Sequence, residues 1–450
     1  MNLLAIATKS IRQRALASAL TGLSVALGVM LMVAVLVIYG IVGEIFSQRS
    51  IGYDLIVGAK GAELQLVLSA IYRVQPPIEN LPYLFYKQLK EDKRIADAVP
   101  LAFGDATEEG AFPIVGTTSR YFELEYAPDR KFMLGVEGRG MGKPFDAIIG
   151  DEVKRKNGWD VGTRFKLVHG GNEAHVHDEE FEVVGVLKRT GTANDRTAFV
   201  NLDGFNMVEG HDTPVEQALE TLRNFFPEDE RIQNLKPEDI AGADGHDHHD
   251  HSGHDHHDHE TADELLEVTA VLLIMEGQDD ADRAFRSVRL KKELKKGQAM
   301  AVNPIVPMRD LMTNVVGNVR TALVVMTGLI IVVSGIGIFV SIYNSMSDRR
   351  REIAIMRALG ARRTTVFSII VAESLLLCVG GGILGLLLGH GLVFLSAPFV
   401  EAQSGLLVDP LAFEPVELIL FPALIALAAL IGFIPAMTAY RTDVARTLAE

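Results

Sequence analysis

Four long apolar runs constrain this chain more than any other feature. They cover residues 18–46, 319–346, 366–399 and 416–440. At the helical rise of about 1.5 Å per residue, each is long enough to cross the roughly 30 Å hydrocarbon core of a bilayer. Backbone polar groups inside lipid must be satisfied within the segment itself, so each run is predicted to be a transmembrane helix. The second run exceeds the length that the core requires, which predicts a helix that tilts or projects beyond the bilayer.

Between the first and second runs lies a long hydrophilic region, residues 47–318, without a further spanning segment. Short runs bounded by glycine or polar turns predict strands at 54–59, 112–116, 146–150, 164–168, 181–187, 197–202 and 267–275. Apolar periodicity predicts helices at 83–92, 214–226 and 280–296. The chain is therefore predicted to be a membrane protein of four transmembrane α-helices with a large α+β exterior (periplasmic) domain between helices 1 and 2. The order of the strands does not follow from the sequence.

The distribution of charge predicts the orientation in the membrane. Basic residues gather in residues 1–17, in the connector 347–365 and in the tail 441–450, whereas the acid behind the formal net charge of −15 lies in the middle region. Because cytoplasmic loops are rich in lysine and arginine, these three segments are predicted to be cytoplasmic. Residues 47–318 and the short loop 400–415 are then periplasmic, on the outer side of a bacterial inner membrane. This asymmetry argues against a nucleic-acid partner.

The connector between the second and third runs has an ordered pattern. Ile353, Ile355, Met356 and Leu359 recur at helical spacing, and Gly360 follows as a residue that can end a helix. The pattern predicts a short amphipathic helix that rests on the membrane surface and offers one face to a cytoplasmic partner. The alternative is an ordinary basic loop that only sets the orientation.

A histidine-rich tract, residues 244–260, interrupts the hydrophilic region. Imidazole is a good ligand for zinc and related ions, and the interleaved aspartates add oxygen ligands. Because the tract has no apolar residue, it is predicted to be a disordered loop that binds several ions weakly and exchangeably. The predicted ligands are His246, His248, His249, His251, His254, His256, His257 and His259, with His175 and His177 as a further pair on one side of an extended segment.

Three interpretations of the tract stay open. It senses or buffers zinc near the membrane, it hands metal to a periplasmic partner, or it is a solvated insertion with incidental affinity. His175 and His177 either complete a site with the tract or belong to an ordinary polar surface. The sequence gives no reason to assign a role to His211 or His390.

Several motifs resemble the FtsX/MacB-like, mechanotransmission-type (type VII) family of ATP-binding-cassette (ABC) transporter permeases. The resemblance is carried by residues 350–377, 380–389 and 434–448, and by the first apolar stretch, 18–29. In the exterior region, 147–201 contains IIG, W-x-VG, VVGV and TGT-x-x-DR in the family's order. The similarity covers most of the chain apart from about 203–263.

The resemblance implies a partner and a mode of action. Two permease subunits, identical or related, pair in the membrane, and two cytoplasmic ABC ATPase subunits dock on their connector helices. ATP-driven closure then moves the exterior domain, which acts on a lipoprotein, a peptide or another envelope component, with a link to zinc or other metals through the tract. The residues that match the ATPase-coupling motif are Arg350, Arg351, Glu352, Ile353, Met356, Arg357, Leu359 and Gly360.

The third run carries two further features. Glu373 matches an acidic position of the family, and an ionisable residue there must face protein or the interface because it is costly in lipid. It either pairs with nearby arginines or takes part in the mechanism. Small residues that permit close helix approach are Gly380, Gly381, Gly382, Gly385 and Gly389.

The chain itself is not predicted to be an enzyme. Gly138–Lys143 (GRGMGK) has the wrong glycine spacing for a phosphate loop, and Pro144 occupies the position of the Ser or Thr that would bind magnesium. A turn is predicted there instead. No catalytic residues and no intrinsic cofactor are predicted; ATP belongs to the partner, and Zn²⁺ or a similar ion to the tract.

Two other functions stay open. The chain is a divalent-metal transporter permease, although its spans hold few ionisable residues beyond Glu373 and His390, whereas ion paths usually need them. Alternatively, it is a signalling scaffold without cargo that activates a periplasmic enzyme. The identity of the substrate does not follow from the sequence.

Overall fold

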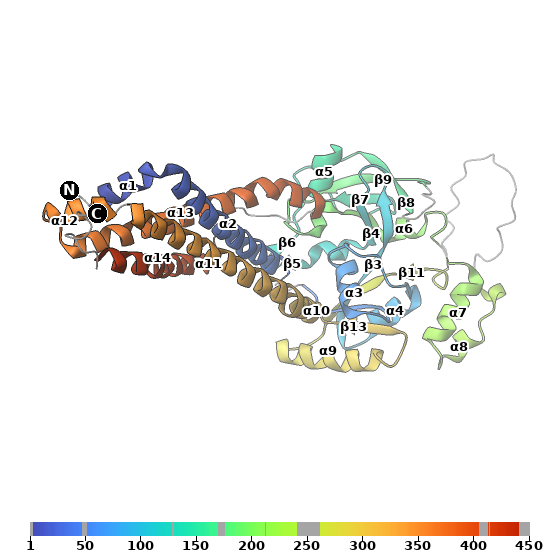
Figure 1. The fold of residues 1–450 in the computed structure, drawn as a ribbon. Coiled ribbons are helices and arrows are strands. Elements are labelled where there is room, and N and C mark those ends of the chain that lie inside the picture. Colours follow the sequence, from blue (N-terminus) through green and yellow to red (C-terminus); the bar gives the residue numbers. More distant parts are fainter. Residues whose placement is uncertain are drawn as a thin grey trace. The chain divides into compact units, whose positions relative to one another are not determined.

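The computed structural model describes residues 3–46, 52–127, 130–169, 176–211, 213–240, 262–348, 350–404, 413 and 415–440 (Figure 1). The chain divides into two compact units. The membrane unit comprises residues 1–45, 311–403 and 407–450, and the exterior unit comprises 46–310 and 404–406. The predicted fold class is confirmed: four helices are long and apolar enough to cross a membrane, and a mixed α/β domain lies between the first and the second.

The described residues of the membrane unit are helical apart from short turns and connections. They form four long helices and two short ones. The short helix α1 precedes the first span, and the short helix α12 lies between the second and third spans. The bounds are α1 Leu3–Gln13, α2 Ala15–Phe46, α11 Gly317–Asp348, α12 Arg350–Ala358, α13 Arg363–Ser404 and α14 Glu417–Tyr440. A π-helical turn, Met312–Val316, precedes α11. Three candidate spans lie in α2, α13 and α14, and the fourth, Ile305–Asn344, begins before the π-helical turn and continues into α11.

Glycines let the backbones of α2 and α13 approach each other closely. Gly381, Gly385 and Gly389 repeat every four residues and therefore lie on one face of α13. A Cβ at Gly385 would lie 2.5 Å from the carbonyl oxygen of Ala26, and one at Gly389 would lie 2.8 Å from the Cβ of Val33. Gly381 meets the Gly22 carbonyl in the same way, at 2.8 Å. Small residues at such contacts maximise packing where no water can drive association.

The two other predicted packing glycines lie on different sides of α13. A Cβ at Gly382 would lie 2.5 Å from the Leu424 side chain of α14. Gly380 is exposed and has no other atom within 4 Å of a Cβ built on it. Four of the five glycines therefore lie at helix contacts, and Gly380 does not.

The exterior unit is built on a nine-stranded sheet with the order β13-β1-β12-β3-β4-β10-β7-β9-β8. The strands are β1 Leu55–Ala59, β3 Ile95–Thr107, β4 Pro113–Thr117, β7 Asp146–Ile149, β8 Arg164–His169, β9 Val176–Val186, β10 Ala198–Asn201, β12 Ala270–Met275 and β13 Ala299–Val302. Two small antiparallel pairs accompany it: β2 Leu81–Pro82 with β11 Glu267–Val268, and β5 Glu125–Ala127 with β6 Arg130–Lys131.

The strand β3 belongs to two parts of this sheet. Its middle pairs with β12 and β4, and its last residues, Asp105–Thr107, pair antiparallel with β8. The strands β3, β4, β10, β7, β9 and β8 consequently form a closed ring, and its apolar cluster includes Trp159, Phe165 and Phe181. The closure brings Asp105 directly opposite His169.

Helices cover the open part of the sheet. The helices of this unit are α3 Glu63–Ala70, α4 Tyr83–Glu91, α5 Asp151–Asn157, α6 Leu202–Asn206, α7 Val215–Phe225, α8 Glu230–Gln233, α9 Asp280–Leu294 and α10 Ile305–Leu311. A second apolar cluster joins Phe85 of α4 and Leu290 of α9 to Leu273 of β12. This cluster is distinct from the one that fills the ring.

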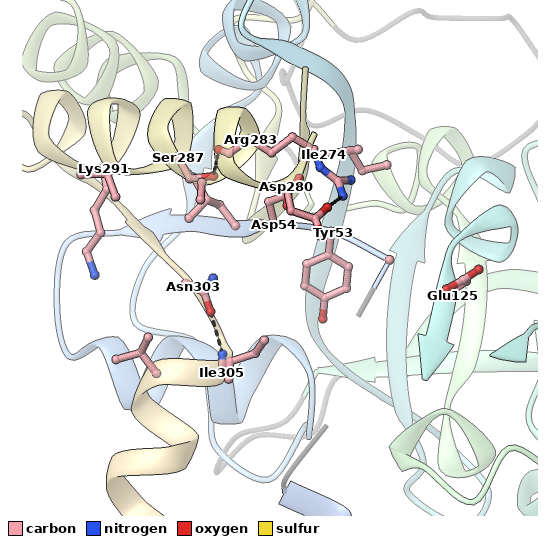
Figure 2. A pocket seen from close by; sticks show the side chains of 15 residues that line it. Tyr53, Asp54, Glu125, Ile274, Asp280, Arg283, Ser287, Lys291, Asn303 and Ile305 are labelled. Carbon is pink, nitrogen blue, oxygen red and sulfur yellow. Dashed lines mark hydrogen bonds and ion pairs between the residues drawn. The ribbon is translucent and has the colours of Figure 1, made fainter. Parts of the chain in front are cut away.

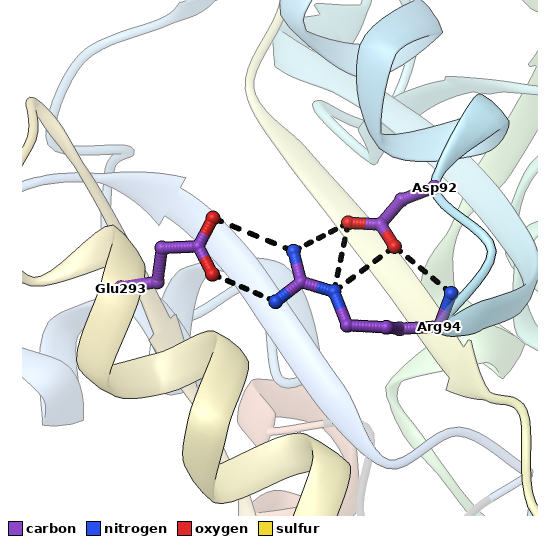
Figure 3. Close-up of polar contacts among 3 residues, drawn as sticks. All are labelled: Asp92, Arg94 and Glu293. Carbon is purple, nitrogen blue, oxygen red and sulfur yellow. Dashed lines mark hydrogen bonds and ion pairs between the residues drawn. The ribbon is translucent and has the colours of Figure 1, made fainter.

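An ion network fixes α9 near the start of β3 (Figure 3). Arg94 donates to Asp92 at 2.6 Å and, through its other terminal nitrogen, to Glu293 at 2.7 Å. The hydrogen bonds from Arg94 lower the pKa of Asp92, and those to Asp92 and Glu293 raise the pKa of Arg94. The planar guanidinium suits this double contact because it can bind two carboxylates in fixed directions.

Each predicted strand run overlaps an observed strand, but two strands of the nine-stranded sheet, β3 and β13, were not predicted, nor were the short strands β2, β5 and β6. β13 is short, and β3 carries Pro100 and Gly104 within an alanine-rich run, which is not typical of a strand. Residues 98–102 are nevertheless fully buried between two neighbouring strands. Tertiary pairing, rather than local preference, therefore makes β3 a strand.

Candidate functional site

The connector helix α12 presents two different faces. Ile353 is only 4% exposed and belongs to the apolar cluster of the membrane unit, with Met356 packed against that cluster. Ile355 and Leu359, four residues apart, are 46% and 84% exposed. The predicted helix is present, but its apolar residues do not form one stripe. One pair packs inward, and the other pair is exposed.

The predicted end of this helix is confirmed. Gly360 has a φ of +101°, and its N–H donates to the Arg357 carbonyl at 3.0 Å. The N–H of Ala361 donates to the Met356 carbonyl, also at 3.0 Å. These two bonds are the Schellman arrangement, which glycine allows because it adopts positive φ at little cost. The helix therefore ends sharply at Ala358, and four residues separate it from Arg363, the first residue of α13.

A groove of about 350 Å³ adjoins the connector helix within the membrane unit. Ile355 lines it together with Ile6 and Lys9 of α1 and Ile369 of α13. Beside it, the hydroxyl of Ser10 donates to Glu373 at 3.0 Å, and Glu373 is 6% exposed. The acidic residue thus has a hydroxyl partner on α1, which the sequence did not suggest. The remaining matched residues, Arg350, Arg351 and Glu352, form the first turn of α12.

A second site lies in the exterior unit, where four metal-ligating side chains converge. Asp105 comes from β3, His169 from the end of β8, His177 from β9 and His211 from the loop after α6. One ligand atom of each lies within 4.8 Å of those of the other three. The imidazole centroids of His169, His177 and His211 are 4.6–5.0 Å apart. These four residues are called the histidine cluster below.

Hydrogen bonds orient the side chains of the histidine cluster. His211 Nδ1 lies 2.7 Å from the carbonyl oxygen of Phe205, and His211 Nε2 lies 3.0 Å from Asp105 Oδ2. The other carboxylate oxygen, Asp105 Oδ1, lies 2.5 Å from His169 Nδ1. Gly210, with a φ of +86°, makes the turn that brings His211 to this position. One carboxylate thus touches two imidazoles, on two different elements.

Burial and charge both act on the cluster. The His177 residue is 2% exposed, and this burial, with the neighbouring His211 and His169, lowers its pKa. Burial alone would raise the pKa of Asp105, but hydrogen bonding to His211 and the two nearby imidazoles outweigh it, and the pKa is lowered. The cluster therefore favours an ionised carboxylate among the three imidazoles.

The predicted metal ligands divide between described and undescribed parts of the chain. His177 lies in the histidine cluster, whereas His175 and all eight tract histidines lie outside the described residues. His211, to which sequence reasoning gave no role, is a member, and Asp105 and His169 were missed altogether. No spacing in the sequence joins these four residues; the pairing of β8 with β3 and with β9, and the loop after α6, bring them together. In the membrane unit, His390 lies 3.0 Å from Glu417.

The glycine-rich segment Gly138–Lys143 is an irregular loop, with turns on either side of it at residues 136–137 and 144–145. Its backbone N–H groups at Gly142 and Lys143 donate to Asp146 Oδ2 at 2.7 and 2.8 Å, and Arg139 binds the same carboxylate. The hydrogen bond from Arg139, followed by those from the two backbone N–H groups, lowers the pKa of Asp146 in spite of its burial. The segment leads into β7 and binds a carboxylate of its own chain.

A cleft of about 640 Å³ lies beside α9 in the exterior unit (Figure 2). Its polar side chains serve the local structure. Asp54 accepts from the Met275 N–H at 2.7 Å, Asn303 accepts from the Ile305 N–H at 3.0 Å, and Arg283 pairs with Asp280. Among the described residues, this cleft therefore contains no nucleophile–base pair of the kind that catalysis requires.

These features define a class: a multi-pass membrane protein with a large mixed α/β domain between its first two spans. Two family models match its two parts. The MacB-like periplasmic core domain covers residues 18–226, and the FtsX-like permease C-terminal domain covers residues 324–444. The chain belongs to the FtsX/MacB-like family of ABC transporter permeases.

Individual relatives match over shorter stretches. The macrolide export ATP-binding/permease protein MacB of Photorhabdus laumondii is 34% identical over 27% of this chain and 18% of its own length. An uncharacterized ABC transporter permease of Methanocaldococcus jannaschii is 32% identical over 26% of this chain and 29% of its own length. The match to the MacB relatives spans about a fifth of their length. The periplasmic region of MacB from Actinobacillus actinomycetemcomitans aligns with 58% of this chain and 94% of its own, at 11% identity and a TM-score of 0.31.

Proposed function

We propose that this chain is the permease subunit of an ABC transporter in which a separate cytoplasmic ATPase docks on α12. The observation that carries the proposal is the division of this helix into two faces. Ile355 and Leu359 are exposed on one side, and Ile353 is buried in the membrane unit on the other. A solvent-facing apolar pair of this kind is typical of a docking surface.

The buried face supplies the means of transmission. Ile353 and Met356 contact the cluster that also contains Ile370 of α13 and Ile338 of α11. Close-packed side chains transmit displacement because they cannot be compressed. Movement of a docked ATPase is therefore expected to move α11 and α13. The exterior unit directly precedes α11 in the chain, so movement of α11 would reach that unit. On this proposal both termini are cytoplasmic, in an inner membrane.

The proposal extends to the assembly and the substrate class. Two copies of the permease, or this chain and a related one, pair in the membrane, and the exterior unit acts on a lipoprotein, peptide or other envelope component. ATP binds the partner only. The histidine-rich tract and a periplasmic metal-binding partner supply the proposed link to zinc. The support for these points is the family, together with the tract's composition.

Docking and transmission can be tested separately. We expect Leu359→Asp and Ile355→Asp to abolish co-purification of the ATPase, because each places a charge on the docking face. Val136→Asp adds the same charge to a fully exposed position of the exterior unit and serves as the control. Ile353→Ala should retain the ATPase but lower the ATP turnover that the permease stimulates. Undiminished co-purification of an ATPase with Leu359→Asp would contradict docking on α12.

A further inference from the structure

The histidine cluster offers a donor set without an assigned role. Three imidazoles and one carboxylate are ligands that Zn²⁺ accepts, at bond lengths of about 2.0–2.2 Å. In a tetrahedral site of that size, neighbouring ligand atoms lie roughly 3.3–3.5 Å apart. The Asp105–His211 contact of 3.0 Å and the mutual limit of 4.8 Å for all four ligand atoms bracket this value. Small side-chain adjustments would therefore place all four donors around one ion.

The hydrogen bond of His211 identifies which of its nitrogens faces the others. A carbonyl oxygen only accepts, so the contact with Phe205 fixes the proton on Nδ1. In the neutral ring, Nε2 then directs its lone pair at a carboxylate oxygen 3.0 Å away. Both side chains are almost fully buried, at 4% and 3% exposure, so facing lone pairs would repel each other there. A second proton on the ring, or a metal ion between the two atoms, removes this repulsion.

This arrangement matches the way proteins orient metal-binding histidines. The nitrogen that does not bind the ion donates to a backbone carbonyl, which fixes the tautomer and the ring plane. A path for the ion also exists. Asp105, His169 and His211 line a cleft of about 460 Å³, and the His169 side chain is 44% exposed. His177 lies deepest, so an ion that enters from this cleft would meet the other three ligands first.

We propose that Asp105, His169, His177 and His211 form a tetrahedral Zn²⁺ site in the exterior unit. It is separate from the histidine-rich tract and independent of the docking proposal. Four protein ligands leave no open position for a substrate or a reactive water, which distinguishes a structural or sensing site from a catalytic one. The ion would join β3, β8 and β9 to the loop that carries His211, and so hold the chain that leads into α7.

The test must remove the tract's own affinity. The protein is therefore the full-length chain with the eight tract histidines replaced by asparagine, purified without metal and titrated with Zn²⁺ against a chromophoric chelator. We expect one Zn²⁺ ion to bind tightly to each chain. Asp105→Asn and His211→Ala should each weaken it by more than about 100-fold, since loss of an outer-shell partner alone typically costs 10–100-fold. Asp178→Asn, on an exposed carboxylate of β9, is the matched control and should change nothing.

Absorption spectroscopy of the Zn²⁺-loaded chain gives a second readout that requires no cluster variant to fold. We expect an X-ray absorption spectrum of three imidazole nitrogens and one oxygen at about 2.0–2.1 Å. The proposed site would be overturned if the titration finds no tightly bound Zn²⁺, or if Asp105→Asn leaves the Zn²⁺ affinity unchanged. An oxygen-only or water-rich coordination shell would overturn it as well, and would leave His211 as an imidazolium paired with Asp105.

Discussion

The membrane unit and the exterior unit achieve close packing in opposite ways. In the membrane unit, bare backbone meets backbone: Gly385 leaves no room for a methyl group beside the Ala26 carbonyl. In the exterior unit, buried carboxylates such as Asp146 and Asp105 are held by arginine, backbone N–H groups or imidazoles. The difference teaches where each unit is vulnerable. The membrane unit should respond to added volume, and the exterior unit to lost charge or lost ligands.

Two unique residues make this comparison measurable in one protein. The sequence has a single tryptophan and a single cysteine. Trp159 is buried in the ring of the exterior unit, stacked on Phe165 at 5.0 Å, and Cys378 is buried in α13 of the membrane unit. Tryptophan fluorescence therefore reports unfolding of the exterior unit, and reaction with a membrane-permeable maleimide reports opening of the membrane unit.

The largest effect is expected from Gly385→Val. The added side chain would overlap the backbone of α2, and overpacking costs about 1–3 kcal/mol, occasionally more. The temperature at which Cys378 becomes reactive should fall, while the fluorescence transition of Trp159 stays near its wild-type value. Gly380→Val is the control, because nothing lies within 4 Å of its Cβ. Equal losses in the two variants would refute the close approach of α2 and α13.

The next effect concerns metal and the exterior unit. A ligand that binds only the folded state at 100 times its dissociation constant stabilises that state by about 2.7 kcal/mol. Saturating Zn²⁺ should therefore raise the Trp159 transition of the chain without tract histidines and leave Cys378 reactivity unchanged. Introducing His177→Gln should abolish the rise. If Zn²⁺ changed only the reactivity of Cys378, it would act on the membrane unit rather than on the exterior unit, contrary to this expectation.

A smaller loss is expected from the network of Figure 3. Arg94→Met removes both carboxylate contacts but keeps an unbranched apolar stem against the protein. Because the network is partly exposed, water screens it, and the loss should be about 1 kcal/mol. Measurement of urea unfolding by Trp159 fluorescence should give a lower midpoint with the slope unchanged. An unchanged midpoint would mean that the network adds no stability.

The smallest effect is a dependence on pH. The pKa of Asp92 in the folded chain lies below its ordinary value of about 3.8, because Arg94 donates to the carboxylate. The unfolded chain then binds more protons near this pH, so the contribution is complete above about pH 4 and is lost as the pH falls through the folded-state pKa. The stability difference between wild type and Arg94→Met should shrink below pH 4. A difference that grows on acidification would have the wrong sign.

The sequence predicted what depends on neighbouring residues. Apolar runs marked the spans, and the end of α12 followed from Gly360, because a helix terminus is a local feature. β3 was missed, since burial between two strands overrides the unfavourable Pro100 and Gly104. The histidine cluster was missed for the same reason. Asp105 and His169 are neighbours only because strands distant in the chain pair with each other. Of the four ligands, only His177 was predicted, from its position beside His175 on an extended segment.

The central claim is that this permease works through a separate ATPase docked on α12. The direct measurement is ATP turnover in lipid nanodiscs by the chain alone, by the co-purified ATPase alone and by the two together. We expect no turnover by the chain alone, stimulated turnover by the pair, and loss of that stimulation with Leu359→Asp but not with Val136→Asp. Hydrolysis by the chain alone, or stimulation that survives Leu359→Asp, would contradict the account.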